Sequence, residues 1–121
     1  MKKLLSACVL AVTMMVSTAY AQAADTAILD WTANTETDLA GYKVYQSTAS
    51  GVYTAPVATL GKVITYTVTL PARIVSGPQT FYFTLTAYDT AGNESVKSLQ
   101  VSKTIPALDL PPSAPTGVTV R

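Results

Sequence analysis

The sequence has no histidine, one cysteine and few charges: 12% of its 121 residues are charged, and the formal net charge is +1. A nucleic-acid binder needs a clustered basic face to meet the phosphates, and this charge balance argues against one. Without histidine, the chain lacks the side chain best suited to proton transfer near neutral pH and the commonest metal ligand. It also contains no Gly-x-Ser-x-Gly elbow, Ser-x-x-Lys pair or glycine-rich phosphate loop. We therefore predict a single, non-catalytic domain that uses no cofactor.

The N-terminus has the pattern of a secretory signal peptide. Lys2 and Lys3 precede an apolar run over residues 4–16, and small residues with an Ala-x-Ala ending follow it. Cleavage fits this pattern after Ala21 or after Ala23. The sequence thus predicts export from the cytoplasm.

Two alternatives to cleavage remain open. Cys8 stands in a stretch that resembles a lipoprotein lipobox, although the apolar region follows it instead of preceding it. The apolar run also suits an uncleaved anchor, although it is short for a membrane span. Removal of a leader of residues 1–23 leaves 98 residues with net charge −1 and no cysteine. We expect a secreted or periplasmic domain that does not span the membrane and is stabilised by its apolar core without a disulfide.

Alternation of apolar and polar residues recurs through residues 24–105, and no stretch has a helical period. Half-buried antiparallel strands have this pattern, and glycine-containing polar turns separate the runs. The sequence therefore predicts an all-β antiparallel sandwich. The expected core residues are Leu29, Trp31, Tyr42, Val44, Phe81, Phe83, Leu85 and Ala87, and the alternation continues near the end at Leu99 and Val101.

Three blocks of residues, in order, resemble a bacterial fibronectin type III domain. They are Leu29-x-Trp31, Asp38-Leu39-Ala40-Gly41-Tyr42-Lys43-Val44-Tyr45, and Phe81-x-Phe83-x-Leu85-x-Ala87-Tyr88-Asp89-x-Ala91-Gly92-Asn93-Glu94-Ser95. The resemblance implies an immunoglobulin-like sandwich in which the blocks are strands B, C and F. It also implies a binding, adhesion or spacer module of the cell envelope with no catalytic residues, whose protein or glycan partner the sequence does not identify.

The chain departs from this family in three places. Phe81 stands where members usually have a tyrosine whose hydroxyl ties down the corner between strands E and F. The connection over residues 71–80 is longer than usual. The third departure is that the domain lacks its first strand, A, because only a few residues separate the cleavage site from Leu29. An unpaired edge would then be left on strand B.

The proline-rich tail, residues 106–121, closes with a stretch from Pro111 to Arg121 that resembles strand A of a further fibronectin type III domain. Three explanations remain open. The tail donates this strand to a neighbouring molecule and builds head-to-tail chains, which would be self-association through residues 111–121. Alternatively, it folds back onto its own domain, or the chain is a fragment of a tandem array, or the tail is a disordered linker.

Three tyrosines lie at positions that face away from the predicted core: Tyr45, Tyr82 and Tyr88. If strands C and F are neighbours, these rings form an aromatic stripe that would bind a glycan or an extended peptide. The competing interpretation is cross-strand aromatic pairing, which needs no ligand.

Two loops expected at the same end of the sandwich carry side-chain oxygens that suit Ca²⁺. The residues concerned are Asn34, Glu36 and Asp38 in one loop, and Asp89, Asn93 and Glu94 in the other. The alternative is ordinary turn chemistry, in which Asp and Asn side chains bond their own backbone. The spacing matches no EF-hand loop.

Overall fold

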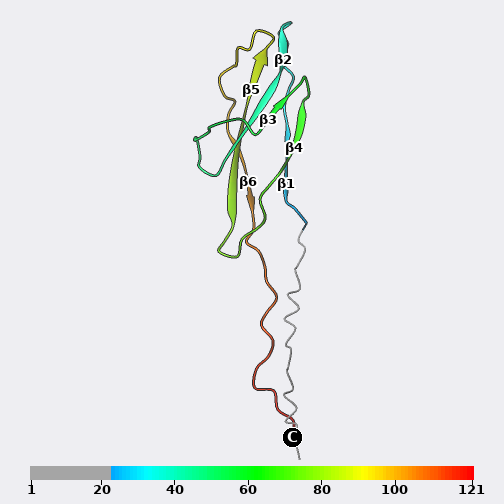
Figure 1. Ribbon diagram of the computed structural model, residues 1–121, viewed down its shortest axis with the longest axis vertical. Helices are drawn as coiled ribbons and strands as arrows, with labels where there is room; N and C mark the ends of the chain where they lie inside the picture. The colour runs from blue at the N-terminus through cyan, green and yellow to red at the C-terminus, as the bar shows by residue number, and fades with distance from the viewer. Residues whose placement is uncertain (1–22) are drawn as a thin grey trace, which may run out of the picture.

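The structure, a computed structural model, describes residues 23–121, so the predicted leader lies outside it except for Ala23. The described chain is all-β, without a helix (Figure 1). Its strands in chain order are β1 (Thr26–Asp30), β2 (Leu39–Ser47), β3 (Ala58–Leu60), β4 (Thr65–Thr69), β5 (Gln79–Asp89) and β6 (Val101–Ile105). Accordingly, residues 23–121 include no helix that could cross a membrane.

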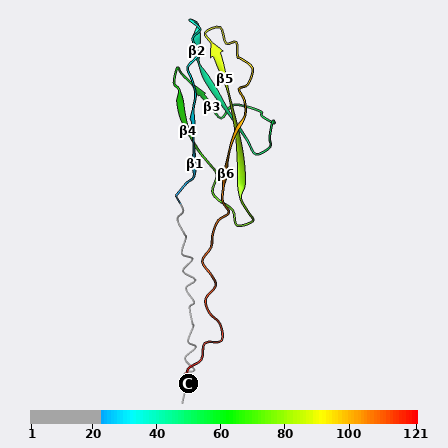
Figure 2. The same cartoon turned by 180° about the vertical axis from the view of Figure 1, so that it is seen from behind.

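The strands form two antiparallel sheets, as a β-sandwich requires. One sheet has only two strands, in the order β1-β4, and the other has four, in the order β3-β2-β5-β6. Both views of the ribbon show the short sheet lying against the long one (Figure 1, Figure 2). The predicted all-β antiparallel architecture is therefore confirmed.

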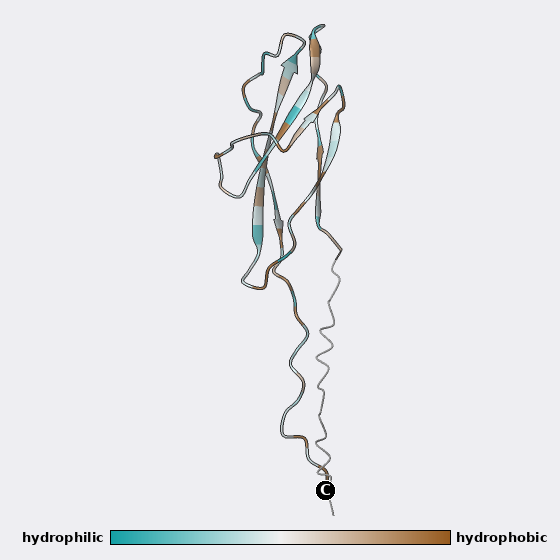
Figure 3. Cartoon of the chain, viewed as in Figure 1, coloured by the Kyte–Doolittle hydropathy of each residue, from teal (hydrophilic) through white to brown (hydrophobic). Residues whose placement is uncertain are grey.

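The core lies between the two sheets. Apolar and polar residues alternate along the strands (Figure 3), and the apolar face of each sheet turns towards the other. Of the predicted core residues, Leu29, Tyr42, Val44, Phe81 and Phe83 are buried. The core also contains buried residues that were not among those predicted: Ala27, Leu39, Val68, Leu70 and Ile105.

Trp31, Leu85 and Ala87 were also predicted to be core residues, but the structure shows them only half-buried. Trp31 and Leu85 pack against the core, and the indole contacts the ring of Tyr42 edge-on with centroids 5.3 Å apart. All three residues line an open hollow beside β1, because no strand formed by residues 23–121 covers that side of the two-stranded sheet. The indole Nε1 is buried and has no hydrogen-bond partner among residues 23–121.

The corner between β4 and β5 is tied to the chain before β1. Arg73 donates from Nε and Nη2 to the two carboxylate oxygens of Asp25, at 2.8 and 2.9 Å. The amide of Leu108 donates to the carbonyl of Ile74, at 2.8 Å. This bond holds the start of the tail at the end of the sandwich where β6 finishes. Beyond it, the tail runs away from the sheets (Figure 1, Figure 2).

Gly41 in β2 lies where the pairing with β5 shifts register. A Cβ atom built on Gly41 would stand 1.9 Å from the carbonyl oxygen of Leu60 and 2.8 Å from the hydroxyl of Tyr88. That same hydroxyl donates to the Leu60 carbonyl, at 2.9 Å. Only glycine therefore lets β3, β2 and β5 approach one another here.

We expect Gly41→Ala to destabilise the domain, because the Leu60 carbonyl is backbone and has to move. The expected loss is roughly 1–3 kcal/mol, which would lower the thermal midpoint by about 4 °C or more. Gly61→Ala is the matched control, since a Cβ atom there meets nothing within 4 Å. Thermal unfolding followed by circular dichroism checks this, and equal midpoints for the two variants would contradict it.

Candidate functional site

Two adjoining hollows open between β1 and β6 on one side of the sandwich. The first, of about 580 Å³, is lined by residues 26–30 of β1, by Phe83 and by residues 101–103 of β6. The second, of about 560 Å³, continues along Trp31 and the 95–99 segment, and both include Leu29, Asp30 and Val101 in their walls. We call the two together the β1–β6 cleft.

One long wall of the cleft is the free edge of β1. On its other side, β1 pairs with β4, and the amides of Leu70 and Trp31 donate to the carbonyls of Asp25 and Ile64, at 2.8 and 3.0 Å. Backbone groups alternate in direction along an antiparallel strand, so odd-numbered residues of β1 face β4 and even-numbered ones face away. The N–H and C=O groups of Thr26, Ile28 and Asp30 therefore point into the cleft.

Lys103 reaches across the cleft from β6, where it shares a face with the buried Ile105. Its ammonium group donates to the backbone carbonyl of Thr26. This bond places a charged side chain against the free edge of β1. An inward-pointing charge of this kind is a common way to protect an exposed strand edge.

The rim of the cleft is apolar because the chain between β5 and β6 turns its hydrophobic residues outwards. Val96 and Leu99 are 90% and 93% exposed, and Val101 is 52% exposed. The sequence predicts Leu99 and Val101 on an inward apolar face. Val101 pairs with the buried Phe83 and does lie on the inward face of β6, where the open cleft leaves it half exposed. For Leu99 the structure contradicts the prediction, because two serine side chains interrupt the regular ladder before β6. Hydroxyl Oγ atoms of Ser95 and Ser98 accept from the β5 amides of Ala87 and Leu85, at 2.9 and 3.0 Å.

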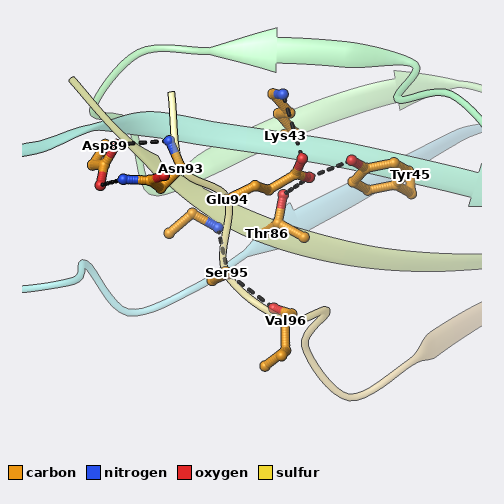
Figure 4. Close-up of polar contacts among 9 residues, drawn as sticks. Lys43, Tyr45, Thr86, Asp89, Asn93, Glu94, Ser95 and Val96 are labelled. Atoms are coloured by element: carbon orange, nitrogen blue, oxygen red, sulfur yellow. Dashed lines mark hydrogen bonds and ion pairs between the residues drawn. The ribbon is translucent and has the colours of Figure 1, made fainter. Parts of the chain in front are cut away.

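A polar cluster centred on Glu94 covers the outer face of β2 and β5 (Figure 4). Its carboxylate accepts hydrogen bonds from the Thr86 hydroxyl, at 2.5 Å, and from the Tyr45 hydroxyl. Lys43 forms an ion pair with it, at 3.5 Å. These donors lower the pKa of Glu94, with Thr86 as the main cause, and the bond to Glu94 raises the pKa of Tyr45.

The aromatic stripe expected on the outer face is largely occupied by the protein itself. Tyr45 faces outwards as predicted, but Lys97 lies 4.8 Å from its ring centroid and Glu94 binds its hydroxyl. As a result Tyr45 is buried, with 5% of its surface exposed, which corrects the expectation of a ring open to a ligand. Tyr88 is half-buried and donates to Leu60, while Tyr82 is half-buried on the same face.

The six residues predicted for calcium do meet in one place. Asn34, Glu36, Asp38, Asp89, Asn93 and Glu94 line a single hollow of about 250 Å³. Asp89, however, accepts from the amides of Ala91 and Asn93 and from the Asn93 side chain, which lowers its pKa. Within residues 23–121 no group of three or more His, Cys, Asp or Glu side chains is placed to hold a metal ion. At Asp89 and Asn93 the structure shows the turn chemistry of the alternative interpretation.

Comparison with protein-family models, with curated proteins and with solved structures finds no match to this chain. The β1–β6 cleft was only partly foreseeable from the sequence. The small number of residues between the predicted cleavage site and Leu29 predicts the free edge of β1, but no pattern in the sequence marks Val96, Leu99 and Lys103 as the rim of the cleft. Their positions depend on the two serine side chains that break the ladder.

We expect Glu94→Gln to lower the free energy of unfolding by about 1 kcal/mol at neutral pH, because the charge that strengthens three hydrogen bonds is lost. A carboxylate whose pKa is lowered by folding stabilises the fold above its unfolded pKa, near 4.5, and this contribution is lost as the pH falls through the lower folded value. The difference between wild type and variant should therefore vanish in acid.

Urea unfolding at several pH values measures this difference. Glu36→Gln provides the control, since Glu36 is exposed and accepts only one long bond, of 3.4 Å, from Asn34. A deficit in Glu94→Gln that stays constant from neutral pH into acid would contradict the assigned role of the carboxylate.

Proposed function

We propose that residues 24–105 form a fibronectin type III-type module, exported to the cell envelope, that acts by binding and not by catalysis. The pairing supports this family. β1 corresponds to strand B and pairs with β4, while β2 and β5 correspond to strands C and F and pair with each other. With β6 beside β5, the only position of an immunoglobulin-like sandwich left without a strand in residues 23–121 is the one beside β1.

The observation that carries the proposal is the β1–β6 cleft. It combines backbone groups of β1 that point away from β4 with an apolar lining from Leu29 and Phe83 and an exposed apolar rim. An exposed sheet edge above apolar pockets is the site that binds an extended polypeptide by strand addition. Main-chain hydrogen bonds give such a site its affinity, and the pockets give it side-chain preference.

A protein partner fits this surface better than a glycan. Sugar rings stack on exposed aromatic faces, and the outer-face rings of Tyr45 and Tyr88 are engaged by Lys97, Glu94 and Leu60. The cleft instead offers a row of N–H and C=O groups at the spacing of a strand. Its natural ligand is therefore an extended peptide segment with alternating apolar residues.

We expect a displayed library of extended peptides to yield binders in which apolar and polar residues alternate. Ile28→Pro should abolish their binding, because it removes an N–H that faces the cleft and leaves the ladder to β4 intact. Tyr82→Ser, on the outer face, should leave binding unchanged. Binding by titration calorimetry, with circular dichroism to confirm folding, measures both effects.

The reverse pattern would contradict this assignment. Peptides that bind Ile28→Pro as well as wild type, but lose affinity for Tyr82→Ser, would place the binding site on the tyrosine face of the sandwich.

A further inference from the structure

We propose that the β1–β6 cleft binds residues 116–121 of a second copy of this chain, so that copies join head to tail. This inference rests on the proposed function and names its ligand. Each copy carries one cleft and one tail, and a contact between two different surfaces repeats from copy to copy. The product is an open chain of molecules or a closed ring.

The tail segment has the properties of an unpaired strand. Residues 116–121 belong to none of the strands of the described chain, and they alternate from Val118 to Arg121 between apolar and polar side chains. Val118 and Val120 are 80% and 95% exposed. β-branched residues at alternate positions suit a pleated, half-buried surface, and here nothing within residues 23–121 covers them.

The spacing of the segment matches the cleft. With Val118 opposite Leu29 and Val120 opposite Ala27, both valines point towards the core from the open side. Thr119 then lies opposite Ile28, whose N–H and C=O face the cleft, and the two residues exchange a pair of hydrogen bonds. A six-residue strand is about 20 Å long at roughly 3.4 Å per residue, enough to cover all five residues of β1.

The direction of the tail favours a second copy. β6 ends, and β1 begins, at the same end of the sandwich, and the tail continues from β6 away from that end (Figure 1, Figure 2). A tail that keeps this direction runs antiparallel to β1 of a copy placed below it in the same orientation. Head-to-tail stacking therefore supplies the antiparallel strand that the edge of β1 lacks.

The same tail does not reach its own cleft in that direction. The bond from Leu108 to Ile74 fixes the tail at the lower end, so residues 109–115 provide the whole free linker. Seven residues span roughly 22 Å at about 3.1 Å each in a polyproline conformation. To lie antiparallel to its own β1, the segment would have to begin beside Trp31, so the linker would first run back up the sandwich past the five residues of β1, roughly 17 Å. That path uses most of the linker and leaves few residues for the two reversals of direction that it requires.

Lys103 competes with the incoming strand for a hydrogen-bond acceptor on β1. In the isolated molecule its ammonium group occupies the carbonyl of Thr26, which an incoming strand needs. The donor strand has to displace it, so association competes with an internal contact. This competition predicts that Lys103→Met, which keeps the length of the side chain and removes the charge, strengthens self-association.

Two variants of the chain recovered after export test the proposal together. Deletion of residues 116–121 leaves a molecule that accepts a strand but donates none, and Ile28→Pro leaves one that donates but does not accept. In sedimentation velocity we expect wild type to form oligomers that grow with concentration, and each variant alone to remain monomeric. An equimolar mixture of the two should form a one-to-one dimer and nothing larger.

Point variants in the tail provide a matched pair that leaves the domain untouched. Val118→Asp places a charge on the face that enters the cleft and should remove the oligomers, while Thr119→Asp points outwards and should retain them. Equal effects of the two substitutions would show that charge, and not strand insertion, controls association, and would overturn the proposal.

Two further results would also overturn it. A wild-type chain that stays monomeric at every concentration excludes head-to-tail assembly. A monomer in which the Ile28 amide exchanges slowly until residues 116–121 are deleted would place the tail in its own cleft. In either case, binding of library peptides that depends on Ile28 would still support the proposed peptide-binding function. If no such binding occurs, both the proposed function and the proposed self-association are wrong.

Discussion

Within residues 23–121, no strand lies beside the edge of β1 that faces away from β4, and the other features of the domain follow from this gap. A sandwich protects its core by covering each sheet with the other and by extending both sheets far enough to close the sides. Here the four-stranded sheet extends past the two-stranded one, so the side between β1 and β6 stays open. Trp31 and Leu85 are half-buried for this reason, and Val96 and Leu99 before β6 are left exposed.

Local polar chemistry holds the domain together around this gap. The Glu94 cluster fixes the loop after β5 against the outer face of β2, and Ser95 and Ser98 replace backbone partners along β5. The fork between Arg73 and Asp25 fastens the opposite end. These contacts stabilise the strands that are present without closing the cleft, so the open side remains available for binding while the sheets stay ordered.

Much of the fold follows from the sequence because apolar and polar residues alternate along strands such as β4 and β5. Phe81 and Phe83 stand at period-two positions, and their burial could be predicted from that spacing alone. Leu99 shows where this reasoning ends. It continues the alternation, but the serine hydroxyls before it interrupt the ladder and leave it exposed. The burial of Tyr45 could not be predicted from the sequence either. Tyr45 lies on the outer face of β2, and the side chains that cover it, Lys97 and Glu94, come about fifty residues later in the chain.

Amide hydrogen exchange along β1 distinguishes an open strand edge from a paired one. In a chain without residues 116–121, we expect fast exchange at Ile28, whose N–H faces the cleft, and slow exchange at Leu29, whose N–H faces β4. Addition of a peptide of residues 114–121 should slow exchange at Ile28 and leave Leu29 unchanged. Equal protection of the two amides before the peptide is added would mean that the edge of β1 is already paired, and would contradict the account.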